Sequence, residues 1–275
     1  MNKAAGCIGR PLHLDSRAMN IAFISAVLPV LLLLWFIYKK DKYQPEPLGK
    51  LVWTFFVGCF SVVPAVLMEQ AIMPLAPDAA SMPVFNGIFT GYAVAGFSEE
   101  LCKLLLLLWL IWRSPHFDEY FDGIVYAAYL SLGFACVENI GYVLQGDDQV
   151  MTALMRGVLA VPAHFLFAVT MGYYVSLAKF DPEHRRRHLW RAFLYPMLLH
   201  GTSDALLMVS GALGEAYGEE NAVVMATCGV LFIVFIVFDV KLWRWGLKRI
   251  KRLQERSKEQ GFDRLHPFDG FTWNF

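Results

Sequence analysis

Ionisable side chains lie inside several apolar stretches of this sequence, where hydrocarbon would surround them. The stretches are "GFSEELCKLL", "FACVENIG", "PAHFLF" and the segment around "HGTSD". A charged side chain at the middle of a bilayer costs about 2.5–3.5 kcal/mol by insertion scales, so these groups must face one another, a metal ion or water. The set consists of Glu99, Glu100, Lys103, Glu138, His164, His200 and Asp204.

Spacing along the chain places some of these groups on common helix faces. Glu99 lies four residues and Glu100 three residues before Lys103, so the lysine can reach either carboxylate. His200 and Asp204 are four residues apart, the spacing with which a zincin helix presents paired metal ligands. The residues therefore suit a metal site, and they also suit a relay of protons or cations.

Other kinds of chemistry have little support in the sequence. The apolar stretches contain no Ser/His/Asp arrangement, no GxSxG motif and no paired aspartates of the presenilin type. The net charge is zero, so no basic field indicates a nucleic-acid partner. The five cysteines are dispersed without a CxxC pair, which is typical of reduced core residues and not of a disulfide framework or a thiolate zinc site. They are Cys7, Cys59, Cys102, Cys136 and Cys228.

Long apolar helices must carry the ionisable residues. The chain is 57% hydrophobic and only 17% charged, with a mean hydropathy of +0.45, whereas a soluble domain is usually about 45–50% apolar. A helix needs about 20 apolar residues to cross the bilayer core. The stretches that qualify are 20–38, 51–75, 86–112, 123–144, 154–178, 190–210 and 222–243.

The sequence thus predicts an all-α, polytopic membrane bundle of about seven transmembrane helices. A single transmembrane domain is expected at 20–245, between an N-terminal tail at 1–19 and a basic cytoplasmic tail at 246–275. This tail either lies against anionic lipid as a basic helix or extends into solvent.

The distribution of lysine and arginine predicts how the bundle is oriented. Basic residues follow the first, third and fifth stretches, and nine occur from Lys241 onward. The loops at 76–85, 145–150 and 211–221 contain none, which predicts an outer N-terminus and a cytoplasmic C-terminus. Three basic residues within the first 17 positions argue weakly the other way. In this orientation the ionisable groups fall between mid-membrane and the outer half, so a catalytic cavity formed by spans 3–6 can hold them.

Four motifs occur in a fixed order on separate apolar stretches. They are EExxK in "FSEELCK", the long segment "FDGIVYAAYLSLGFACVENIGY", the histidine in "PAHFLFA" and HxxxD in "HGTSD". With "DKYQPEPLGKL" after the first stretch, they resemble the PrsW family of intramembrane metalloproteases, which is related to CAAX prenyl proteases and bacteriocin-related membrane proteins. The resemblance covers about residues 40–245.

The resemblance implies a role for each candidate residue. Glu99 and Glu100 take the diglutamate positions, where one carboxylate activates a water and the other supports it or the metal. Lys103 would pair with them and keep one carboxylate ionised. The other residues would supply ligands to one divalent metal ion, expected to be zinc: Glu138, His164, His200 and Asp204.

The implied activity is hydrolysis of a peptide bond within or close to the membrane. Zinc would lower the pKa of a bound water toward ~7 and polarise the scissile carbonyl. A glutamate would then pass the proton of the water to the leaving amine. The implied substrate is a single-pass membrane protein or membrane-anchored peptide, for example an anti-sigma factor. The implied location is the lipid bilayer of the bacterial inner membrane.

Other interpretations accompany these predictions. A proton- or cation-coupled transporter would use similar groups, although we see no inverted repeat. A non-catalytic binding or immunity protein would be expected to have lost a motif residue, and all are present. Glu138 with Asn139 also suits an interhelical hydrogen bond. Arg156 is expected to snorkel at an outer membrane edge, and Asp122 to cap its helix.

Overall fold

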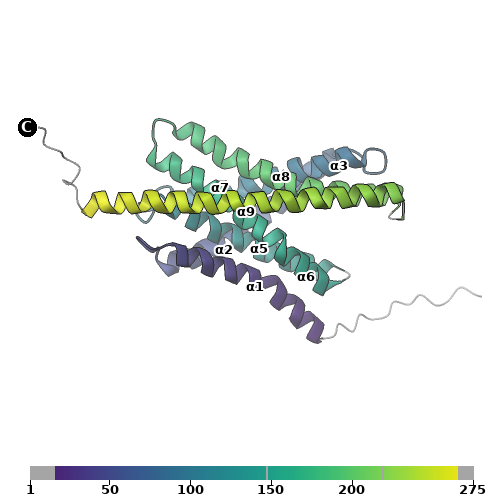
Figure 1. The fold of residues 1–275 in the computed structure, drawn as a ribbon, viewed down its shortest axis with the longest axis horizontal. Coiled ribbons are helices and arrows are strands. Elements are labelled where there is room, and N and C mark those ends of the chain that lie inside the picture. Colours follow the sequence, from purple (N-terminus) through teal and green to yellow (C-terminus); the bar gives the residue numbers. More distant parts are fainter. Residues whose placement is uncertain (1–15, 147, 219, 266–275) are drawn as a thin grey trace, which may run out of the picture.

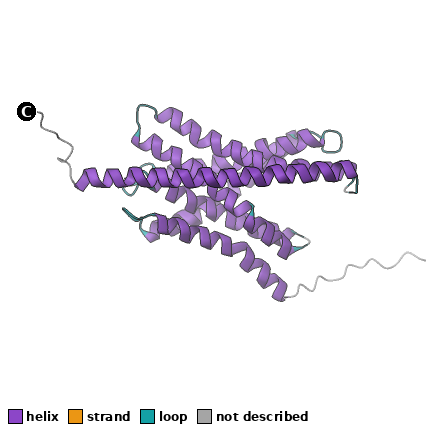
Figure 2. Ribbon diagram, in the orientation of Figure 1, coloured by secondary structure: helices purple, strands orange, loops and turns teal. Residues whose placement is uncertain are grey.

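The computed structural model describes residues 16–146, 148–218 and 220–265, and every regular element within them is helical (Figure 2). In chain order these are α1 (Ser16–Lys40), α2 (Leu48–Ile72), the 3-10 turn η1 (Met73–Leu75), α3 (Pro83–Phe89), the π-helix η2 (Thr90–Gly96), α4 (Phe97–Ile111), α5 (Asp122–Gln145), α6 (Gln149–Val158), α7 (Ala160–Phe180), α8 (Arg185–Tyr217) and α9 (Ala222–Leu265). The predicted all-α class is confirmed. The four described cysteines are free, and Cys7 lies outside the described residues.

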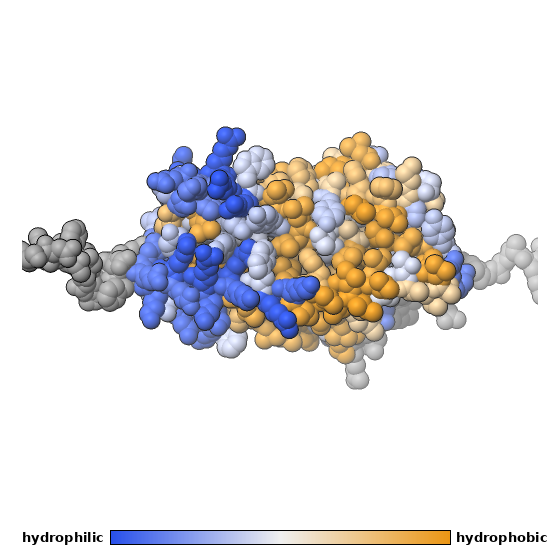
Figure 3. All heavy atoms as spheres, turned by 45° about the horizontal axis from the view of Figure 1, so that its top comes forward, coloured by the Kyte–Doolittle hydropathy of each residue, from blue (hydrophilic) through white to orange (hydrophobic). Residues whose placement is uncertain are grey.

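Six helical segments are long and apolar enough to cross a membrane, so the protein is an integral membrane protein. They are Met19–Lys40, Leu48–Leu75, Asp122–Gln145, Gln149–Phe180, Arg185–Tyr217 and Ala222–Gly261. Apolar side chains cover much of the surface in Figure 3, and hydrophilic ones gather at the end where α9 finishes. The remaining predicted stretch, 86–112, is helical but is divided among α3, η2 and α4.

The helices α5 and α7 form the centre of the bundle (Figure 1). In the most apolar window of each span, 83% of α5 is buried and 78% of Gln149–Phe180, against 22% of α1 and 11% of α9. Helix α2 packs closely on α5, because a Cβ at Gly58 or Gly133 would collide with a backbone carbonyl of the facing helix. The outer helices α1 and α9 therefore present most of their apolar surface to lipid.

The π-helix η2 brings α4 against α8. A Cβ at Gly91 would lie 2.6 Å from a backbone nitrogen of α8, and a Cβ at Gly201 would collide with the ring of Tyr92. The two segments can approach this closely only because both positions are glycine. Since α4 begins directly after η2, this contact places Glu99 and Glu100, in the first turn of α4, beside α8. Short π segments of this kind are frequent at functional sites.

The predicted fifth span, 154–178, is a bent helix. Its two parts, α6 and α7, meet at Leu159, where ψ is −59° and φ is −108°. Pro162 in the first turn of α7 has no N–H to donate, so the helical ladder is interrupted at Val158. The bend turns Arg156 of α6 and His164 of α7 toward the same cavity.

The helix α9 continues as one element of 44 residues beyond position 245, where the membrane domain was predicted to end. Its C-terminal part packs on the bundle. Ser257 Oγ accepts a hydrogen bond from the Phe121 backbone N–H at 2.8 Å, and Gln254 donates to the backbone carbonyl of Lys40. The described part of the predicted tail is thus a docked helix. The predicted domain boundaries themselves stay a prediction.

Candidate active site

An ion-paired triad at the start of α4 forms the first part of the site. Lys103 Nζ lies 2.9 Å from Glu99 Oε2 and 2.9 Å from Glu100 Oε1, as the three- and four-residue spacings predict. The three residues are 1%, 4% and 0% exposed, respectively. Removing the ammonium would leave two buried carboxylates without compensation, which is strongly unfavourable. Lys103 therefore holds the two glutamates in place.

Two histidines from different helices complete this group. His164 Nδ1, on α7, lies 3.2 Å from Lys103 Nζ, and His200 Nδ1, on α8, lies 2.9 Å from Glu100 Oε1. The two imidazole centroids are 5.1 Å apart, and the His200 ring stacks on Phe167 at 4.9 Å. The packing of α4, α7 and α8 thus converges on one buried polar centre.

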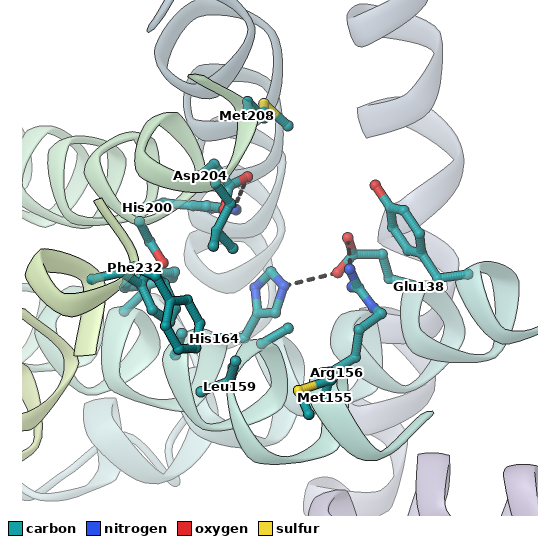
Figure 4. Close-up of a pocket in the computed structure, with 16 residues that line it drawn as sticks. Glu138, Met155, Arg156, Leu159, His164, His200, Asp204, Met208 and Phe232 are labelled. Atoms are coloured by element: carbon teal, nitrogen blue, oxygen red, sulfur yellow. Dashed lines mark hydrogen bonds and ion pairs between the residues drawn. The ribbon is translucent and has the colours of Figure 1, made fainter. Parts of the chain in front are cut away.

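The outer nitrogen of each histidine faces a further carboxylate. His164 Nε2 lies 2.8 Å from Glu138 Oε2, and His200 Nε2 lies 3.3 Å from Asp204 Oδ2 (Figure 4). Glu138 Oε1 also accepts from Arg156 Nη2 at 3.0 Å. Each imidazole therefore lies between an inner polar partner and an outer carboxylate. All seven residues predicted from the sequence belong to this one network.

Asn139, next to Glu138, links helices to one another. Its Nδ2 donates to the backbone carbonyl of Ala26 on α1 at 2.9 Å, and its Oδ1 accepts from Arg156 Nε at 3.1 Å. This is the interhelical hydrogen bond that the sequence offered as an alternative role for the Glu138–Asn139 pair. It fixes the arginine that in turn holds Glu138.

Four residues of the network offer donor atoms close enough to hold one metal ion. One donor atom from each lies within 4.8 Å of all the others, and all four are buried: Glu99, Glu100, His164 and His200. Imidazoles and carboxylates are a donor set that zinc takes. In addition, Glu100 Oε2 is buried without a hydrogen-bond partner, which leaves it available for a cation. The donors therefore fit a metal ion, and the predicted ligands Glu138 and Asp204 lie outside this group of four.

Two cavities reach the site from different directions. The first, of about 410 Å³, lies among α5, α6, α7, α8 and α9, and both His164 and His200 line it (Figure 4). The second, of about 450 Å³, lies among α2, η2, α4, α5 and α8, and Glu99 lines it. Glu138 and Asp204 line both cavities. Substrate or water can thus approach the cluster from two sides.

Sequence reasoning missed two charged residues at these cavities. Arg156 was expected to snorkel, but it pairs with Glu138 and lies over the Tyr142 ring at 3.8 Å. The expectation is wrong because the break at Leu159 turns α6 toward the site. Glu69 of α2 lines the second cavity, and an acidic residue inside the apolar stretch 51–75 was the signal that should have identified it.

The predicted helix cap at Asp122 is also wrong. Phe121 occupies the N-cap position of α5, and Asp122 is the first helical residue. The Asp122 Oδ2 atom accepts from the backbone N–H groups of Asp118 at 3.0 Å and Glu119 at 2.7 Å. The carboxylate therefore closes the loop that precedes α5 and does not satisfy amides of the helix itself.

Comparison with known proteins identifies the family of this chain. The family model described as PrsW family intramembrane metalloprotease matches residues 46–239. Protease PrsW of Clostridioides difficile (strain 630) is 34% identical over 251 residues, which are 88% of this chain and 95% of that protein. Protease PrsW of Geobacillus kaustophilus (strain HTA426) is 34% identical over 240 residues, 87% of this chain and 95% of that protein.

Protease PrsW of Bacillus subtilis (strain 168) is 32% identical over 241 residues, 87% of this chain and 99% of that protein. No solved structure matches this chain. The region matched by the family model contains all seven site residues. The chain therefore belongs to the PrsW family of intramembrane metalloproteases.

Proposed function

We propose that this protease uses one zinc ion to hydrolyse a peptide bond of a membrane-embedded or membrane-proximal segment. The observation that carries the proposal is the compact buried group of two histidines and two glutamates beside two cavities. A bound zinc ion supplies a polarised scissile carbonyl and a water of lowered pKa. The residues of the chain supply the ligands, the proton transfers and the substrate cavities.

Three residues are proposed as the ligands: His164, His200 and Glu100. The histidines line the first cavity, and Glu100 has the free carboxylate oxygen. We assign Glu138 and Asp204, predicted as ligands from the sequence, to the outer nitrogens of the two imidazoles. Carboxylates in this position orient a ligating histidine and raise its basicity.

The general base is proposed to be Glu99. It lines the second cavity, whereas Glu100 is 0% exposed, so Glu99 is better placed to meet a water. Its carboxylate takes the proton from the attacking water and returns it to the leaving nitrogen as the C–N bond breaks. Lys103, bonded to Glu99 at 2.9 Å, favours the ionised form in which it can act as a base.

The substrate is proposed to be a single-pass membrane protein, such as an anti-sigma factor, or a membrane-anchored peptide. A chain cut in its interior needs space on both sides of the scissile bond, and the two cavities meet at Glu138 and Asp204. The first cavity is lined largely by apolar side chains, including Met155, Leu159 and Phe232. Such a lining suits apolar residues next to the scissile bond, as a membrane segment has.

The membrane topology is proposed from the distribution of lysine and arginine along the chain. We propose that α3, η2 and α4 together form one further crossing, the third in chain order, so that the chain crosses the membrane seven times. With the distribution of basic residues, this gives an outer N-terminus and a cytoplasmic C-terminus. The named relatives come from bacteria, which supports placement in the bacterial inner membrane.

The test is the metal content of the detergent-purified protein beside its activity on a membrane-anchored reporter. Wild type is compared with His200→Ala and Glu138→Gln, and exposed Asp148→Asn is the control. We expect near-stoichiometric zinc in wild type and control, loss of zinc and cleavage in His200→Ala, and retained but weaker zinc in Glu138→Gln. Wild-type protein that contains no zinc, does not rebind it and still cleaves the reporter would refute the metal role.

A further inference from the structure

A second group of buried carboxyls lies at the other end of α5, where the loops after α1 and before α5 meet. It combines residues from "DKYQPEPLGKL" and from "EYFDGIVY". Asp41, Glu46, Glu119 and Asp122 are 4%, 5%, 1% and 0% exposed. Asp122 and Glu138 are 16 residues apart on one helix, so this group lies about 24 Å from the candidate active site.

Hydrogen bonds fix the orientation of these carboxyls. Asp41 Oδ2 accepts from the Glu46 backbone N–H at 2.8 Å, and Glu46 Oε2 accepts from the Tyr126 hydroxyl. The Asp122 Oδ2 atom is held by two loop amides at 2.7 and 3.0 Å. Each of the three carboxyls therefore has one oxygen anchored by the surrounding structure.

The second oxygens of two of them have no partner. Asp41 Oδ1 and Asp122 Oδ1 are buried and accept no hydrogen bond. One carboxyl oxygen from each of Asp41, Glu119 and Asp122 lies within 4.8 Å of the other two. Within 16–146, 148–218 and 220–265, no lysine, arginine or histidine forms an ion pair with Asp41, Glu46 or Asp122. A buried unpartnered carboxylate oxygen is costly, so Asp41 and Asp122 each offer one buried oxygen that a cation would satisfy.

We propose that this group binds a hard divalent cation, Mg²⁺, Ca²⁺ or Mn²⁺, through Asp41, Glu119 and Asp122. The donors are all oxygen, which suits these ions and not a zinc site with imidazole or thiolate ligands. The two unpartnered oxygens are the atoms that the cation would satisfy. Because Asp41 follows α1 and Asp122 begins α5, the ion joins the ends of two helices.

The site also touches the docked end of α9. Phe121, adjacent to Asp122, donates to Ser257 of α9, and Lys40, adjacent to Asp41, accepts from Gln254 of the same helix. A cation at this position would therefore stabilise the whole end of the bundle at which α9 docks. This role does not depend on zinc or on the proposed catalytic assignments.

The experiment is thermal unfolding of the detergent-purified, zinc-containing full chain at pH 7.5, followed by tryptophan fluorescence. Mg²⁺, Ca²⁺ and Mn²⁺ are each titrated into divalent-free buffer, and bound Mn²⁺ is counted by electron paramagnetic resonance. The variants are Asp122→Asn and Asp41→Asn, and the matched control is Glu183→Gln, an exposed carboxylate in the α7–α8 loop.

We expect Tm of wild type and control to rise by roughly 5 °C when one of these cations exceeds its Kd about 100-fold. The rise and one bound Mn²⁺ should be lost in Asp122→Asn and in Asp41→Asn, while zinc content is unchanged. If one variant fails to fold, the other gives the answer. No shift with any of the three cations in wild type overturns the proposal. A Tm rise in both folded variants equal to that of wild type also overturns the proposal. If acidification to pH 6 raises Tm and none of the three cations does, the buried carboxyls share protons in place of a cation and the proposal is overturned.

Discussion

The two buried acidic groups of this protein contain the same kind of side chain but differ in what faces it. In the site on α4, Glu99 and Glu100 share the ammonium of Lys103 at 2.9 Å, and two histidines lie beside them. At the far end of α5, Asp41 and Asp122 face amides and further carboxyls, and each keeps one unpartnered oxygen. In the first group Lys103 compensates one of the two carboxylate charges, whereas in the second Asp41 and Asp122 form no ion pair among the described residues.

This difference has its origin in sequence distance. The α4 triad is formed by neighbours three and four residues apart, so its charge balance is local. The other group joins the loop after α1 with the start of α5, 81 positions apart from Asp41 to Asp122. Its environment depends on how the ends of α1 and α5 pack. The local group is suited to chemistry that needs fixed charges, and the distant one to holding the fold together.

The largest effect is expected at the proposed general base. Replacing Glu99 with Gln removes proton transfer while keeping the shape of the side chain, so cleavage of a membrane-anchored reporter should fall about 10²–10⁴-fold. Zinc content should stay near that of wild type. Loss of zinc together with activity would instead make Glu99 a ligand. The same change at Glu46, in the second acidic group, should leave the rate within about twofold.

The next largest effect is expected on stability. Lys103→Met leaves Glu99 and Glu100 buried without their cation, which should lower the free energy of unfolding by about 3–5 kcal/mol. Thermal unfolding in detergent measures the loss. Lys251→Met is the control, because its ion pair with Glu255 is 3.8 Å long and exposed and should contribute less than about 1 kcal/mol. Equal effects of both substitutions would show that the triad is not the paired group we describe.

A smaller effect is expected at the outer carboxylate of His164. Glu138→Gln keeps a hydrogen-bond partner for the imidazole but removes the negative charge, so the affinity for zinc should fall about 10–100-fold. Competition with a chelator of known affinity measures the change. Complete loss of zinc would return Glu138 to the ligand role predicted from the sequence.

The smallest effect is expected from pH on the second acidic group. The raised pKa values of Asp41, about 6, and Glu46, about 7, mean that the folded chain takes up protons before the unfolded chain does. Without divalent cations, stability should therefore rise by about 1–2 kcal/mol as the pH falls from 7.5 to 6. The other groups that face these two are also acidic or phenolic: Asp118, Glu119, Asp122 and Tyr126.

Denaturant unfolding at both pH values measures this change. Glu46→Gln should flatten the dependence, since most of the proton uptake in this window belongs to Glu46. A stability that falls between pH 7.5 and 6 would contradict the assignment, because it would require a group with a lowered pKa to dominate.

Much of the fold and the membership of the candidate site could be predicted from the sequence. The length of the apolar stretches predicted the long helices, and the cost of charge in hydrocarbon predicted that Glu99, His164 and His200 lie together. The π-helix and the break at Leu159 could not be predicted in this way, because both arise from how glycine and proline interrupt a regular ladder against a neighbouring helix.

The second acidic group escaped sequence reasoning for a related reason. Charged loop residues are expected to be solvated, so Asp41 and Glu46 gave no signal of burial. Their burial arises in the folded bundle, where α9 docks on the loop before α5 and α1 packs on α5. The partner of a loop residue depends on tertiary contacts that no local pattern records.

The pairing of Lys103 with its own helix has a consequence for how the protein is made. Membrane helices enter the bilayer in the order of synthesis, and α4 precedes α7 and α8 in the chain. Because Lys103 reaches Glu99 and Glu100 within one turn, the segment can compensate one of its two negative charges before either histidine has been synthesised. We expect the polar centre to insert with only one carboxyl uncompensated and the later helices to assemble around it.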